Sequence, residues 1–154
     1  MDKGLLDFLI KAKIATYASK GNNASVKPLM EGSRQLEFQD GDFFYRDIYF
    51  GMSYFIGQET VYHFGNPIWS MSYAGGVEKQ YEIEFVQEVY AFLRKSMRMI
   101  TSESPFRGPK EFIMEDFFYS DAHSGNLSQF VGEETITFRN KEVYRLNYSG
   151  GYIR

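Results

Sequence analysis

Apolar residues near the start of the chain recur at helical spacing. Four of them occupy the i, i+3, i+4 and i+7 positions of an amphipathic helix: Leu5, Phe8, Leu9 and Ala12. The pattern predicts a helix over residues 4–17, ended by Gly21 and the two asparagines that follow it. A second helical pattern over residues 79–100 predicts another helix.

Each predicted helix is followed by a block in which apolar and polar residues alternate. Residues 37–73 and 111–153 are rich in Phe, Tyr, Ile and Val and are interrupted by glycine-containing turns. Alternation of this kind predicts β-strands joined by short turns. Each block is therefore expected to form an antiparallel meander.

The second block repeats the first. Asp-Phe-Phe-Tyr at residues 42–45 recurs at 116–119, and Glu59-Thr60 recurs at nearly the same offset as Glu134-Thr135. Self-similarity at a fixed period marks a repeated structural unit. We predict an α+β fold made by tandem duplication of a helix plus an antiparallel β-meander, with repeats of approximately 1–76 and 77–154.

The two repeats are too short to form separate cores, so we expect a single domain over residues 1–154. The simplest assembly is one curved antiparallel sheet with pseudo-twofold symmetry and with two helices packed on one face.

Composition narrows the classes of protein to consider. The 154 residues include no cysteine, which excludes disulfides, thiolate zinc sites and cysteine nucleophiles. The net charge of -3 lacks the basic footprint of a nucleic-acid binder. With no apolar run of signal-peptide or membrane-span character, the chain is expected to be cytoplasmic, with no direct nucleic-acid partner and no membrane partner.

One face of the predicted sheet combines aromatic rings with carboxylates, because alternate residues of a strand share a face. Ten residues on it are candidate ligand-binding residues: Tyr45, Asp47, Glu59, Trp69, Tyr73, Tyr119, Asp121, Glu134, Tyr144 and Tyr148. These residues form either a groove or the core. They form a site only if this face points away from the helices.

The carboxylates of this face have a structural interpretation and a chemical one. Glu59 and Glu134 are expected to accept hydrogen bonds from tyrosine hydroxyls or turn amides, with Arg34 or Arg107 as a cationic partner. A carboxyl desolvated among aromatics is also suited to general acid or base catalysis. Asp47 and Asp121 are expected near strand ends, where closing a turn is favoured over ligand binding.

The sequence offers little support for metal or cofactor chemistry. Asp121-Ala122-His123 is too short a motif to predict a metal site, so no metal and no cofactor is expected. The chain also lacks a glycine-rich phosphate loop and a Gly-x-Ser-x-Gly nucleophile elbow.

Several segments resemble a bacterial family of unknown function: residues 5–12, 36–38, 41–45, 49–51, 55–59, 67–73 and 105–109. Proteins of that family occur alone or behind an Xre-type helix-turn-helix domain in transcriptional regulators. The resemblance implies a regulatory or sensory role and supplies no catalytic residues.

Three functional hypotheses follow. The first is a non-enzymatic domain that binds a small-molecule effector or a regulator protein. The second is a hydrolase that uses a desolvated glutamate as general acid or base. The third is a structural subunit of a homo-oligomer, such as a homodimer.

Overall fold

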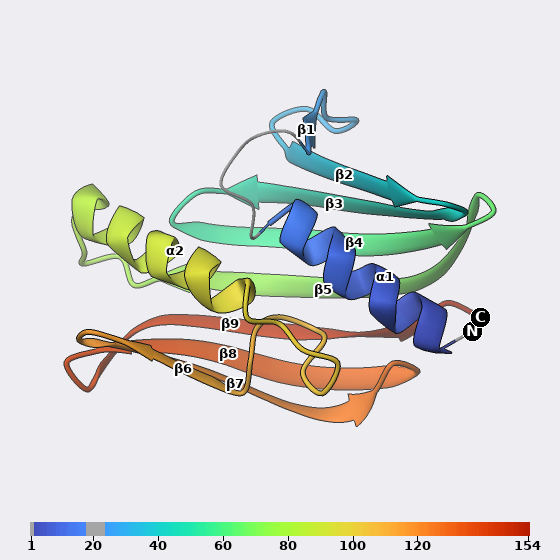
Figure 1. The fold of residues 1–154 in the computed structure, drawn as a ribbon. Coiled ribbons are helices and arrows are strands. Elements are labelled where there is room, and N and C mark those ends of the chain that lie inside the picture. The colour runs from blue at the N-terminus through green and yellow to red at the C-terminus, as the bar shows by residue number, and fades with distance from the viewer. Residues whose placement is uncertain (1, 18–23) are drawn as a thin grey trace.

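The computed structural model describes residues 2–17 and 24–154, and within these it forms two helices and nine strands (Figure 1). The helices are α1 (Asp2–Ala15) and α2 (Ile83–Met97). The predicted helix end at Gly21 lies outside the described residues. The strands are β1 (Ser25–Val26), β2 (Arg34–Asp40), β3 (Phe43–Gly51), β4 (Tyr54–His63), β5 (Asn66–Val77), β6 (Glu111–Met114), β7 (Phe117–Asn126), β8 (Gln129–Phe138) and β9 (Lys141–Tyr152).

All nine strands form one antiparallel sheet in the order β1-β2-β3-β4-β5-β9-β8-β7-β6. β5 and β9 therefore pair at the centre of the sheet. The other strands of the first block lie on the β5 side, and the other strands of the second block lie on the β9 side. At the junction of the blocks Tyr73 pairs with Tyr148, its counterpart in the second block. This pair is the point of the β5–β9 ladder at which one position of the first block lies opposite its own counterpart in the second block.

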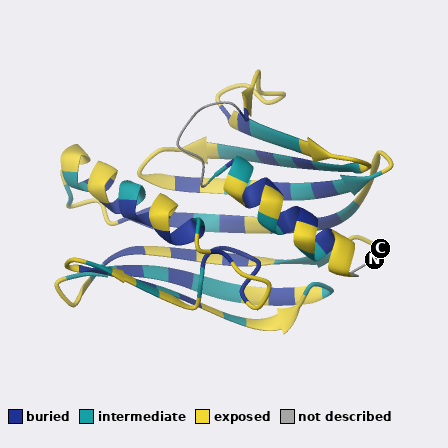
Figure 2. Ribbon diagram, in the orientation of Figure 1, coloured by how far each residue is buried: buried dark blue, intermediate teal, exposed yellow. Residues whose placement is uncertain are grey.

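Both helices lie over the same side of the sheet, which we call the inner face (Figure 1). The four apolar residues predicted for the buried side of α1 are indeed buried. The buried side of α2 includes Val89, Phe92 and Leu93. These side chains belong to one hydrophobic cluster with Phe55 and Leu146 of the sheet. Burial alternates along the strands because successive side chains point to opposite faces (Figure 2).

The β3–β4 hairpin of the first block and the β7–β8 hairpin of the second share one backbone conformation at a glycine. Gly51 and Gly125 occupy corresponding positions near the ends of β3 and β7 and have φ of 97° and 94°. A Cβ at either position would lie 2.1 Å from a backbone oxygen, so only glycine fits there.

The outermost strands of the sheet are short. β1 has two residues and β6 has four. Short edge strands offer few free backbone groups to a neighbouring sheet. Within the described residues, neither helix has the length and apolar character needed to cross a membrane.

Candidate functional site

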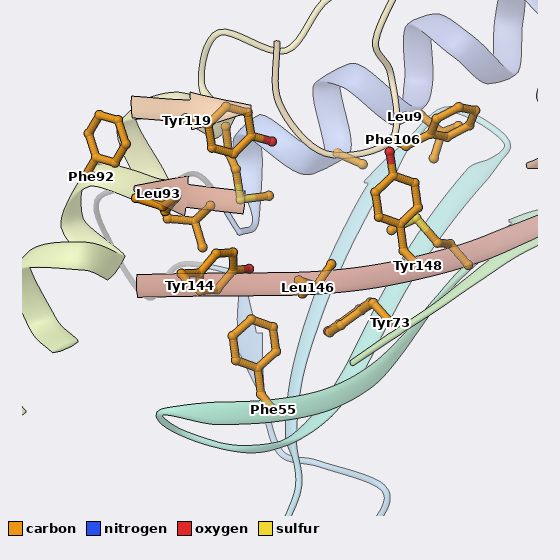
Figure 3. Close-up of a cluster of buried hydrophobic side chains, with 14 of the residues drawn as sticks. Leu9, Phe55, Tyr73, Phe92, Leu93, Phe106, Tyr119, Tyr144, Leu146 and Tyr148 are labelled. Atoms are coloured by element: carbon orange, nitrogen blue, oxygen red, sulfur yellow. The ribbon is translucent and has the colours of Figure 1, made fainter. Parts of the chain in front are cut away.

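The ten side chains predicted as a ligand site all point to the inner face and lie beneath the helices. All ten are buried, with at most 4% of any residue exposed. In Figure 3, Tyr144 and Tyr148 extend from β9 to the side on which Leu93 and Phe106 lie. The face is therefore core, and an open groove on this side does not fit the geometry.

In the first block, a lysine from α1 reaches the buried glutamate. Lys13 is 1% exposed, and its Nζ donates to Glu59 Oε2. Directly opposite Glu59 on β3, Asp47 accepts a 2.6 Å hydrogen bond from the Tyr73 hydroxyl. The hydroxyl of Tyr45 lies beside Glu59, and burial together with this carboxylate raises the pKa of Tyr45.

In the second block, the cation comes from the loop before β6. Arg107 donates to Glu134 through Nη2 at 3.0 Å and through Nε at 3.3 Å. The hydroxyls of Tyr119 and Tyr144 donate to the same carboxylate at 2.6 and 2.7 Å. The structural interpretation of Glu134 as an acceptor of tyrosine hydroxyls thus matches this geometry. Arg34, the alternative cation, is exposed.

The two aspartates of this face hold their protons to unusually high pH. Burial, followed by repulsion from Glu59, raises the pKa of Asp47 to about 7. The same two causes, with Glu134 as the neighbour, raise the pKa of Asp121 to about 6. Asp121 accepts hydrogen bonds from both Tyr148 and Ser104, and these bonds limit the rise.

Asp47 and Asp121 do not close turns. Each lies in the middle of its strand, opposite a buried glutamate of the neighbouring strand, so the expectation of a strand-end position was wrong. The alternation predicts their face correctly, but the strands extend further than the turn residues suggest. His123 Nδ1 lies 3.7 Å from Asp121 Oδ2, and no group of metal-ligating residues forms in the described part of the chain.

The opposite side of the sheet, which we call the outer face, is hollowed. One cavity of about 1420 Å³, the outer hollow, is lined by residues from β3 to β7 across the centre of the sheet. The outer hollow reaches strands on both sides of the β5–β9 junction. Leu29 and Met30, in the loop before β2, add to its rim.

The lining of the outer hollow is apolar at its sides and polar along its floor. Ile56 and Val131, at corresponding positions of the two blocks, are 57% and 56% exposed, and Phe50 is 40% exposed. Ser72 and Ser149, paired across the β5–β9 junction, lie between them. Clustered apolar exposure of this kind typically marks a binding surface.

Sequence reasoning missed the outer hollow. The residues of this face, such as Gln58 and Ser72, are mostly polar, so the alternation directs attention to the aromatic face instead. A signal was present in Ile56 and Val131, which are apolar yet share a face with Gln58 and Glu133. They are exposed because no helix among the described residues covers this face. The alternation of residues alone does not show which face the helices cover.

The described residues define the class broadly: an α+β protein with two helices and one nine-stranded antiparallel sheet, whose outer face carries a cavity of about 1420 Å³. The chain belongs to the domain of unknown function family DUF5680, whose model matches residues 47–153. The resemblance to a family of unknown function is thereby confirmed. No curated protein and no solved structure matches the chain.

Proposed function

We propose that the chain is a non-enzymatic binding protein that holds a small amphipathic molecule in the outer hollow. The observation that carries the proposal is the hollow itself, with about 1420 Å³ of space on the sheet face opposite the helices. Pockets for small molecules usually measure ~300–1000 Å³, so the space suffices for a ligand and its surrounding water.

The apolar sides of the hollow favour a ligand over an empty surface. More than half of Ile56 and of Val131 is exposed, and burying such a side chain stabilises a complex by about 25 cal/mol per Å² of apolar surface removed from water. The concave shape favours a small molecule that enters the hollow over a flat protein surface. The serines of the floor would bind its polar groups.

The hydrolase hypothesis has less support. Glu59 and Glu134, the carboxylates it requires, are completely buried and already bound to Lys13 and Arg107. A general acid or base must reach its substrate directly or through one water. The binding hypothesis needs no rearrangement of the helices, and we prefer it for that reason.

Nile red, a neutral dye whose emission rises in apolar surroundings, tests the binding proposal. We expect saturable binding to the parent protein and at least about tenfold weaker binding to Ile56→Asp and Val131→Asp, since a charge among apolar groups opposes binding. Ile113→Asp is the matched control, because Ile113 is 69% exposed and lies outside the hollow. Equal loss in all three variants would argue against the hollow as the site.

We extend the proposal to a regulatory or sensory role in a bacterial and cytoplasmic setting, as the family resemblance implies. Binding must then change the surface that a partner protein meets. Hydrogen exchange of the protein with and without bound dye tests this extension. Identical exchange outside the hollow would leave the protein a carrier or buffer of its ligand and would argue against a sensor.

We further propose that the fold arose by tandem duplication and that both helices pack on one face through the same pseudo-twofold relation. The mirrored strand order and the pairing of Tyr73 with Tyr148 support this origin. A crystal structure tests it: residues 34–77 and 111–152 should superpose by a nearly twofold rotation, and a failure to superpose would refute it.

A further inference from the structure

The two sides of the outer hollow differ in polarity even though they occupy corresponding positions of the two blocks. Ile48 and Phe50 line the hollow on the β3 side. The corresponding residues on the β7 side are Ala122 and Ser124. At these positions the β3 side of the hollow is bulky and apolar and the β7 side is small, although Val131 on β8 keeps one apolar side chain on that side. A ligand with two identical ends would not bind more tightly because of this difference.

The two sides of the outer hollow also differ in charge. Gln58 on β4 corresponds to Glu133 on β8. Arg145 contacts Glu133 at 2.5 Å and Glu142 at 2.6 Å, so two carboxylates share one guanidinium. The β8 side thus carries an excess of negative charge close to the cavity.

The β3 side is closer to neutral. Arg46, which lines the hollow, pairs with Glu37 at 2.9 Å, and its guanidinium lies 5.1 Å from the centre of the Phe44 ring. One cation and one anion balance each other there. An anionic ligand group would find the Arg46 guanidinium already engaged.

The distance between the two sides suits one elongated molecule. Phe50 and Glu133 occupy the same row of the outer face, which runs through Ile56, Ala74 and Asn147. They are four strand spacings apart, which is roughly 19 Å along the sheet at ~4.8 Å per strand. Asn147 lies beside Glu133 and adds an amide to the polar end.

We infer that the ligand of the outer hollow is an amphipathic molecule with a neutral or cationic, hydrogen-bond-donating head group. The head lies over β8 and β9 near Glu133, and the apolar body lies against Phe50 and Ile56 on β3 and β4. This inference rests on the proposed binding function and specifies which ligands that function serves. An anionic head is disfavoured by Glu133 and by the net charge of -3.

Three molecules with the same alkyl chain test the head-group preference: laurylamine, monolaurin and laurate, each below its micelle concentration. Displacement of Nile red from the parent protein gives their relative affinities. We expect laurylamine and monolaurin to compete at least about tenfold more strongly than laurate. Equal competition by laurate would overturn the inference while leaving the binding function intact.

The correspondence of the two blocks supplies matched variants. Glu133→Gln gives the β8 side the residue of the β4 side and should reduce the advantage of laurylamine over laurate by about two- to fivefold. Phe50→Ser should weaken monolaurin by about tenfold, whereas the reciprocal Ser124→Phe should not weaken it. Circular dichroism of each variant verifies that it is folded.

The remaining outcomes are also decisive. If Phe50→Ser and Ser124→Phe change affinity equally, the assigned orientation is wrong although binding occurs. If Nile red does not bind and sedimentation shows a dimer that Ile56→Asp dissociates, a second copy of the chain fills the hollow. That result would overturn both the binding function and the inference.

Discussion

Asp47 and Glu59 lie directly opposite each other on β3 and β4, and both are completely buried beneath the helices. Asp121 and Glu134 have the same relationship on β7 and β8. Each glutamate has a buried cation as its partner, whereas each aspartate is held by hydroxyl groups. Burial and the neighbouring glutamate raise the pKa of both aspartates, so each keeps its proton well above pH 4.

The raised pKa of Asp47 predicts how the stability of the protein varies with pH. The folded pKa of about 7 exceeds the unfolded value of 3.8, so the folded state binds the proton more tightly. The contribution of Asp47 to stability is complete below about pH 4 and is lost as the pH rises toward 7. Asp47→Asn, which resembles the protonated form, should remove this loss and raise the thermal midpoint at pH 8.

Thermal unfolding of parent and variant from pH 5 to pH 8 measures this effect. The advantage of Asp47→Asn should shrink as the pH falls. Asp42→Asn serves as the control, because Asp42 is exposed in the turn before β3 and should show no such trend. A constant difference between Asp47→Asn and the parent at all pH values would show that Asp47 does not change its protonation in this range.

Glu134 is predicted to be essential for stability. Glu134→Gln would leave the buried Arg107 without a counter-charge, and breaking a buried ion pair in this way typically costs about 3–5 kcal/mol. The thermal midpoint should fall by many degrees or the protein should fail to fold. Glu133→Gln is the control, since the side chain of this neighbouring glutamate is 41% exposed. A loss in Glu134→Gln no larger than in Glu133→Gln would contradict the assigned role.

The fold was largely predictable because its signals are local. The spacing of Leu5, Phe8, Leu9 and Ala12 predicted a helix that is observed, and the alternation in residues 37–73 and 111–153 predicted strands of one antiparallel sheet. The face shared by Asp47 and Glu59 also followed from alternation. These features depend only on neighbours within a few residues.

The candidate site was less predictable because it depends on which face the helices cover. Alternation shows that Ile56 and Glu59 point in opposite directions, but it is equally compatible with a helix on either side. The partner of Glu59 was missed for a related reason. Lys13 sits within a helix far earlier in the chain, and its own neighbours in sequence give no sign that it is buried.

Two glycines are predicted to respond to alanine in opposite directions. A Cβ on Gly57 would lie 2.4 Å from the hydroxyl of Tyr73, which cannot move without losing its bond to Asp47. Gly57→Ala should therefore cost about 1–3 kcal/mol. A Cβ on Gly4 in α1 meets only ordinary contacts at 3.9 Å, so Gly4→Ala should gain up to about 1 kcal/mol. Urea unfolding measures both, and stabilisation by Gly57→Ala would contradict the close approach of Tyr73.

Lys13 and Glu59 are predicted to be strongly coupled. Burial lowers the pKa of Lys13, while Glu59 opposes this shift and favours its charged form. Lys13→Met leaves Glu59 without a cation, and Glu59→Gln leaves Lys13 without an anion, so each change alone should cost about 3–5 kcal/mol. The double variant buries neither an unpaired cation nor an unpaired anion at these positions. It should be more stable than either single variant.

A double-mutant cycle by urea unfolding tests this coupling, which should amount to at least about 1 kcal/mol. Lys11→Met is the matched control, because Lys11 is on the same helix and its ion pair with Asp40 is largely exposed. That change should have little effect, since water screens an exposed pair. If the losses from Lys13→Met and Glu59→Gln simply add, the two groups act independently. In that case the Lys13–Glu59 ion pair would not help to hold α1 on the sheet.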